Sequence, residues 1–157
     1  MAPRINLSTS PLGAKVSRQF YAASLAVMKG TTLPKATQDL VMLRASQING
    51  CGYCTDAHSK DLAHGDEPSV RINLVAAWRE STVFTDAERA ALELTEQGTR
   101  IADAAGGITD EAWENAAKHY DEEELAALTL IISLINAANR MGVITRMPGG
   151  DYQPGTV

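Results

Sequence analysis

Apolar residues recur at helical spacing through most of this chain, and no stretch shows the alternation that a half-buried strand requires. Glycine, proline and capping residues separate the helical stretches. The pattern predicts an all-α fold, a compact bundle of about six to seven helices. The expected helices cover residues 17–29, 35–48, 51–64, 68–78, 85–103, 109–119 and 121–141.

The ends of several of these helices carry specific signals. Gly30 and the Asn49–Gly50 pair are expected to stop the first and second helices. Thr85 with Glu88 three residues later forms a capping-box pattern, and Asp121 precedes three glutamates that suit a helix N-terminus. The last helix is apolar around most of its circumference, which is typical of a central core helix, of an oligomer interface, or of both.

Chain length predicts one domain. A chain of 157 residues is long enough to bury a single hydrophobic core. Residues 1–15 contain two prolines and a glycine and are expected to form an N-terminal arm. Residues 142–157 are expected to form an irregular tail because they are rich in glycine and proline.

Charge and hydropathy exclude several classes of partner. The formal net charge is −5 and no basic run is present, which argues against binding to nucleic acid. No apolar run approaches the roughly 18 residues that span a bilayer, so no membrane partner is expected. The first residues lack the profile of a secretory signal. The expected localisation is therefore cytoplasmic.

The two cysteines of the chain suggest its chemistry. Cys51 and Cys54 stand three residues apart, and His58 follows one helical turn later. Thiols at this spacing can close a disulfide, or they can bind a soft metal with His58 and Asp61 as further ligands. Redox use is favoured over a purely structural role because a cytosolic chain rarely uses cysteines as a staple. It is favoured over a metal site because zinc prefers four good ligands.

Helical geometry places these side chains on one face. Cys54 and His58 lie within about 60° of Cys51 around a helix that begins near residue 51. If Asn49–Gly50 reverses the chain, Asp39 of the preceding helix lies at nearly the level of His58 and is expected to face it, directly or through a water. A carboxylate, an imidazole and a thiol in this order form a proton relay that can generate a thiolate.

The string DLVMLRASQINGCGYCTDAH, residues 39–58, closely resembles the core of alkylhydroperoxidase-D-like members of the carboxymuconolactone decarboxylase family. The resemblance runs from about residue 34 to residue 96 and resumes weakly around residues 134–140. It implies an all-helical fold with the CxxC pair at the N-terminus of a central helix. It also implies a homo-oligomer, often a trimer or hexamer.

The resemblance also implies roles for the site residues. Cys54 would attack a peroxide, Cys51 would resolve the product, and His58 would be the base that acts on Cys54. Asp39 stands where the family usually has a glutamate, and Tyr53 stands where some members have a second histidine. The implied reductant is an external dithiol or a lipoylated protein.

We therefore expect a thiol-dependent reductase of small hydroperoxides, with catalytic residues Cys54, Cys51, His58 and Asp39 and no cofactor or metal. Three alternatives remain open from the sequence. The first is a disulfide oxidoreductase without significant peroxidase activity. The second is a relative that decarboxylates or processes lactones, although such members generally lack the CxxC. The third is a non-enzymatic module that responds to redox state or metal.

Overall fold

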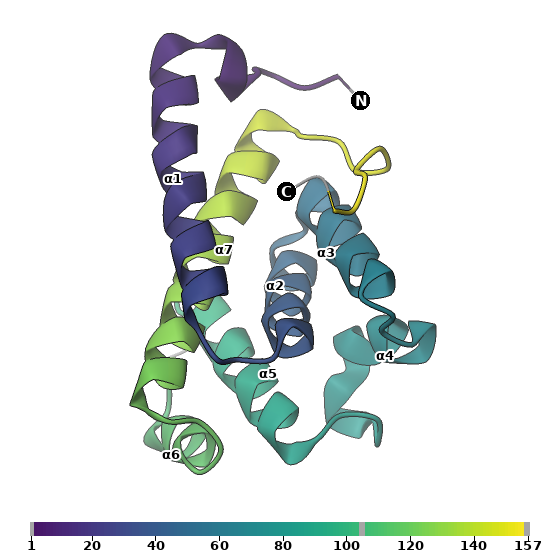
Figure 1. Ribbon diagram of the computed structural model, residues 1–157, viewed down its shortest axis with the longest axis vertical. Coiled ribbons are helices and arrows are strands. Elements are labelled where there is room, and N and C mark those ends of the chain that lie inside the picture. Colours follow the sequence, from purple (N-terminus) through teal and green to yellow (C-terminus); the bar gives the residue numbers. More distant parts are fainter. Residues whose placement is uncertain (1, 104–105, 156–157) are drawn as a thin grey trace.

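A computed structural model describes residues 2–103 and 106–155, and within these residues it contains helices and no strand. This confirms the all-α prediction (Figure 1). The elements in chain order are a 3₁₀ turn η1 (Leu7–Thr9), α1 (Pro11–Gly30), α2 (Lys35–Asn49), α3 (Gly52–His64), α4 (Ser69–Leu74), a 3₁₀ helix η2 (Val75–Glu80), α5 (Asp86–Thr99), α6 (Asp110–Ala117) and α7 (Glu122–Thr145).

The helix boundaries show how local sequence fixes the elements. The expected capping box forms at the start of α5, where the Thr85 side chain accepts from the backbone N–H of Glu88. At the start of α7 the Asp121 side chain accepts from the backbone N–H of Glu124, in a capping box that was not predicted from the sequence. Gly50 ends α2 with a φ of 66°, a left-handed conformation that glycine adopts without steric cost. The reversal expected between α2 and α3 therefore forms at Gly50.

The two ends of the chain are more helical than the sequence suggested. Helix α1 begins inside the expected arm, because Pro11 occupies a first-turn position that needs no donor and the Ser10 side chain accepts from the N–H of Gly13. Helix α7 continues past Gly142 into the expected tail, since a glycine inside a helix costs only about 1 kcal/mol. In contrast, α5 ends at Thr99, four residues before the expected end at 103.

Helices α2 and α7 form the centre of the bundle. Helix α2 packs against α3, α5 and α7, and α7 also contacts α1, α3 and α6. Seven consecutive α2 residues, from Thr37 to Leu43, are buried. A separate hydrophobic cluster, built around Leu62, Trp78 and Phe84, lies between α2, α3 and the segment from α4 to α5. The loop between α2 and α3 is consequently held from several sides.

Helix α7 requires one correction to the sequence prediction. By length and composition alone it could cross a membrane, contrary to the expectation that no stretch reaches that length. In the structure it carries ten buried residues and packs against five other helices. We therefore interpret α7 as the core helix of the bundle.

Candidate active site around the Cys51–Cys54 disulfide

The two cysteines form a disulfide at the start of α3. Cys51 is the N-cap residue of that helix, and its Sγ accepts a hydrogen bond from the backbone N–H of Cys54 at 3.3 Å. Sulfur here occupies the position that a Ser or Asp oxygen commonly fills, at the positive end of the helix dipole. Both residues are buried, with exposed fractions of 1% for Cys51 and 6% for Cys54. After reduction, the same position at the start of α3 would stabilise a Cys51 thiolate.

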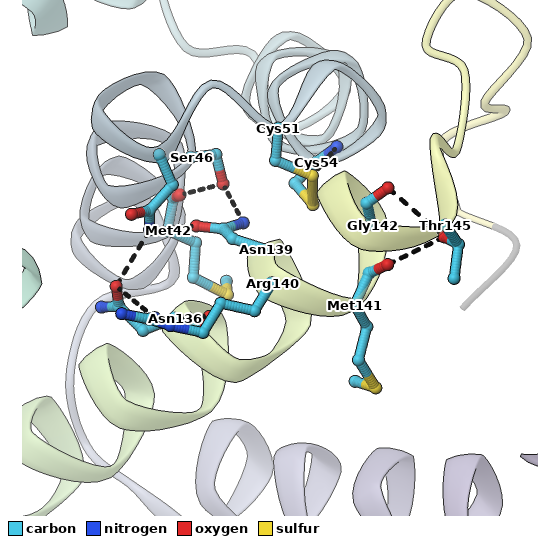
Figure 2. The surroundings of a disulfide bond; sticks show 11 residues. Met42, Ser46, Cys51, Cys54, Asn136, Asn139, Arg140, Met141, Gly142 and Thr145 are labelled. Atoms are coloured by element: carbon cyan, nitrogen blue, oxygen red, sulfur yellow. Dashed lines mark hydrogen bonds between the residues drawn. A yellow bond between two sulfur atoms is a disulfide. The ribbon is translucent and has the colours of Figure 1, made fainter. Parts of the chain in front are cut away.

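Gly142 of α7 packs directly against this disulfide (Figure 2). A Cβ atom at this position would lie 2.8 Å from the Sγ of Cys51 and 3.6 Å from the Sγ of Cys54. The sulfur atoms therefore occupy space that any other residue would fill with its side chain. From the sequence, Gly142 was expected to begin the irregular tail, and only its contact with α3 reveals its role.

Buried amides connect α7 to the end of α2, next to the disulfide (Figure 2). The Nδ2 of Asn139 donates to the Ser46 hydroxyl at 3.0 Å, and its Oδ1 accepts from Asn49 at 2.9 Å. The backbone carbonyl of Ser46 in turn accepts from the N–H of Cys51 at 3.1 Å. Asn139 and Ser46 are fully buried. This network fixes the turn that presents Cys51, and two asparagines within the apolar pattern of α7, Asn136 and Asn139, were the sequence signal for it.

A cavity of about 650 Å³ opens beside the disulfide, between α1, α2, α3, α7 and the C-terminal segment. Among its described lining residues are Cys54 and His58, whereas Cys51 is absent from the wall. Much of the remaining wall is apolar and includes Phe20, Leu25, Met28, Met42, Leu134 and Ile135. Of the two sulfurs, therefore, it is that of Cys54 that a molecule in this cavity could approach.

His58 lies one turn after Cys54 on α3 and lines the same cavity. Burial, helped by the positive charge of Lys35, lowers the pKa of His58 from 6.5 to about 4. The imidazole is consequently neutral at physiological pH. Within the described part of the chain, its buried Nδ1 has no hydrogen-bond partner.

Asp39 is buried on α2 and also lines the cavity, so the structure brings all of the expected site residues except Cys51 to one wall. Its carboxylate is bound by the ammonium of Lys35, one turn earlier in the helix. No hydrogen bond joins Asp39 to His58 in the described residues, so the direct form of the expected relay is not formed. Burial raises the pKa of Asp39, and the bond from Lys35 opposes that shift. The ion pair with Lys35 was not predicted from the sequence, because it depends on the burial of the Asp39 carboxylate.

Residues 2–103 and 106–155 contain no group of three or more His, Cys, Asp or Glu side chains placed to hold a metal ion. Asp61, the further metal ligand considered from the sequence, instead accepts a hydrogen bond from the Tyr152 hydroxyl at 2.8 Å.

An all-helical bundle with a CxxC disulfide at the start of α3 is an AhpD-like fold. The model of the carboxymuconolactone decarboxylase family matches residues 14–97, and the chain belongs to that family. Both findings confirm the resemblance drawn from residues 39–58.

Relatives agree with this assignment. The chain is 37% identical over 115 residues to the uncharacterized protein YdfG of Bacillus subtilis, covering 73% of this chain and 77% of the relative. It is 31% identical over 133 residues to the uncharacterized protein YnjA of Escherichia coli, covering 82% and 71%. A crystal structure from Agrobacterium tumefaciens, of a protein of unknown function described as a putative antioxidant defence protein AhpD, superposes with a TM-score of 0.87. That pair is 35% identical, with coverage of 96% of this chain and 100% of the other.

Proposed function

We propose that this protein is a thiol-dependent hydroperoxide reductase that cycles between the Cys51–Cys54 dithiol and its disulfide. The observation that carries the proposal is the asymmetry of the pair: Cys54 lines the cavity beside a neutral histidine, and Cys51 is buried behind it against Gly142. An attacking thiol needs access to substrate, and a resolving thiol needs only access to its partner.

The first chemical step uses His58 as a base. Neutral His58 takes the proton of the Cys54 thiol, and the start of α3 stabilises the thiolate. The thiolate attacks the distal oxygen of R–O–O–H; an S–O bond forms and the O–O bond breaks. Cys54 becomes a sulfenic acid, and the alkoxide leaves as an alcohol after it receives the proton from His58.

The second step closes the disulfide. The Cys51 thiol attacks the sulfenic sulfur of Cys54, and the hydroxyl leaves as water. An external dithiol, which we propose to be a dithiol protein or a lipoyl group on a partner protein, then reduces the disulfide by exchange. Asp39 would influence His58 without a direct hydrogen bond, since its carboxylate is already bound by Lys35.

The homo-oligomer, expected as a trimer or hexamer, also belongs to this proposal. Helix α1 supports it, because within the described structure none of its residues is fully buried and it exposes Leu12 and Val16. Light scattering of the purified chain measures the assembly. A cytoplasmic location agrees with a dithiol that must be reduced in each cycle.

Variants of the cysteines test the reaction. We expect Cys54→Ser to abolish consumption of an organic hydroperoxide in the presence of a dithiol. We expect Cys51→Ser to consume one equivalent and to accumulate a sulfenic acid or a mixed disulfide, detected by mass spectrometry. Unchanged turnover in Cys54→Ser would refute the proposal. Dithiol exchange without peroxide consumption in the wild-type protein would instead favour the disulfide oxidoreductase.

A further inference from the structure

The C-terminal strap, residues 147–155, leaves α7 and lies next to α3 (Figure 1). The carboxylate of Asp56 accepts from the backbone N–H groups of Gly150 and Tyr152, at 2.8 and 3.2 Å. The ammonium of Lys60 donates to the carbonyls of the same two residues, at 2.8 and 3.0 Å. Asp56 and Lys60 are also paired with each other at 2.8 Å. One ion pair on α3 thus satisfies four backbone groups of the strap.

The strap reaches the CxxC turn itself. A Cβ atom on Gly149 would lie 2.6 Å from the backbone oxygen of Gly52, the residue between Cys51 and Tyr53. Only a glycine permits this approach without displacing one of the two backbones. The contacts from Gly149 to Tyr152 therefore place the strap in register along α3, beginning at the disulfide.

This register directs the Tyr152 side chain to the cavity. Tyr152 lines the cavity together with Cys54 and Tyr53, and its hydroxyl donates to Asp61, about two turns later on α3. Its ring packs edge-to-face on that of Tyr53, with centroids 6.2 Å apart. Burial and the bond to Asp61 raise the pKa of Tyr152, which keeps the hydroxyl protonated as a donor.

We infer that Tyr152 is an access-determining residue for the Cys54 sulfur, with the C-terminal strap as the clamp that holds its ring at the cavity wall. The mechanism above needs Cys54 to meet two reagents of different size, a hydroperoxide and a reducing dithiol. With the ring in place, a compact reagent reaches the sulfur more easily than a bulky one. Opening the strap removes one wall of the cavity and favours the bulky reagent selectively. The inference rests on the proposed function only in taking Cys54 as the reacting thiol.

The test measures access without peroxide turnover, so its result is independent of the proposed reaction. In a Cys51→Ser background, the alkylation rate of Cys54 is followed by mass spectrometry with iodoacetamide and with a bulky aromatic maleimide. We expect Tyr152→Ala to raise the maleimide rate by about tenfold, the opening factor that loss of one hydrogen bond and its ring contact allows. The iodoacetamide rate should change less than about twofold, a change of well under 1 kcal/mol in the barrier.

Two further variants separate gating from general damage. Asp56→Ala releases the strap from outside the cavity and should also raise the ratio of the two rates. Asp151→Ala changes an exposed carboxylate in the same strap and should leave the ratio unchanged. An unchanged ratio in both Tyr152→Ala and Asp56→Ala would overturn the inference. An equal rise for both reagents would also overturn it, because the strap would then affect the reactivity of the thiol rather than access to it.

Discussion

Substitution of Gly142 by alanine tests how the fold sets the redox balance of the dithiol. The new Cβ would lie 2.8 Å from the Sγ of Cys51, whereas carbon atoms normally approach a neighbour no closer than about 3.5 Å. The disulfide fixes both sulfurs, so Cys51 cannot rotate away without moving the backbone. In the reduced protein the same sulfur is free to adopt another rotamer.

The magnitude follows from this difference between the two states. Overpacking a dense core by one methyl group costs about 1–3 kcal/mol, and we assign that cost mainly to the disulfide form. Replacing glycine by alanine within a helix returns about 1 kcal/mol, equally in both forms, so this gain cancels from the redox equilibrium. A penalty of 1–3 kcal/mol on the oxidised form corresponds to a reduction potential about 20–65 mV less negative.

The assay equilibrates the Gly142→Ala and wild-type proteins in defined dithiol buffers and traps free thiols by alkylation. Gly30→Ala is a matched control, because a Cβ on Gly30, the last residue of α1, meets no atom within 4 Å. We expect a shift for Gly142→Ala only. A potential unchanged from wild type within measurement error would contradict the reasoning, as would an equal shift in Gly30→Ala.

Two further predictions concern buried polar groups. Because burial lowers the pKa of His58 from 6.5 to about 4, the unfolded chain binds more protons in that window, and stability should fall as pH drops from about 6.5 to about 4. His58→Gln should flatten this part of the Tm-versus-pH curve, and His119→Gln, an exposed control, should not; identical curves for all three proteins would refute the shift. Asn139→Ala should lower the free energy of unfolding by about 2–4 kcal/mol, since it leaves the buried Ser46 hydroxyl and a neighbouring amide each without one partner. Denaturant titration against the exposed control Asn73→Ala measures this effect, and equal stability of the two variants would contradict it.

Local signals predicted the helices well where each signal acts within one turn. The capping box at Thr85, the stop at Gly50 and the acidic helix start at Asp121 formed as expected, because the partners in each case lie within a few residues. The errors arose where one residue type has two meanings. Pro11 was expected to lie in the N-terminal arm and is instead the first residue of α1, and Gly142 was expected to begin the tail and is instead inside α7.

Helical spacing was also sufficient to place Cys54 and His58 on one wall, since both belong to the same helix. It was not sufficient for the carboxylate. Asp39 and His58 line the same cavity, but the Lys35 ammonium is one turn from Asp39 and binds its carboxylate. Competition between partners depends on rotamers and burial, which the level of a residue along a helix does not specify.

The sequence by itself determined the helical class, the dithiol and the order of its two sulfurs along the chain, because these depend on spacing and local capping. The tertiary structure decided which sulfur lines the cavity, that Gly142 packs against the disulfide, and that His58 is neutral. Those features arise where α3 meets α7, α2 and the C-terminal strap, across separations of some 90 residues such as that from Asp56 to Gly150. Packing and desolvation act between elements that no local pattern connects, so only the folded chain fixes them.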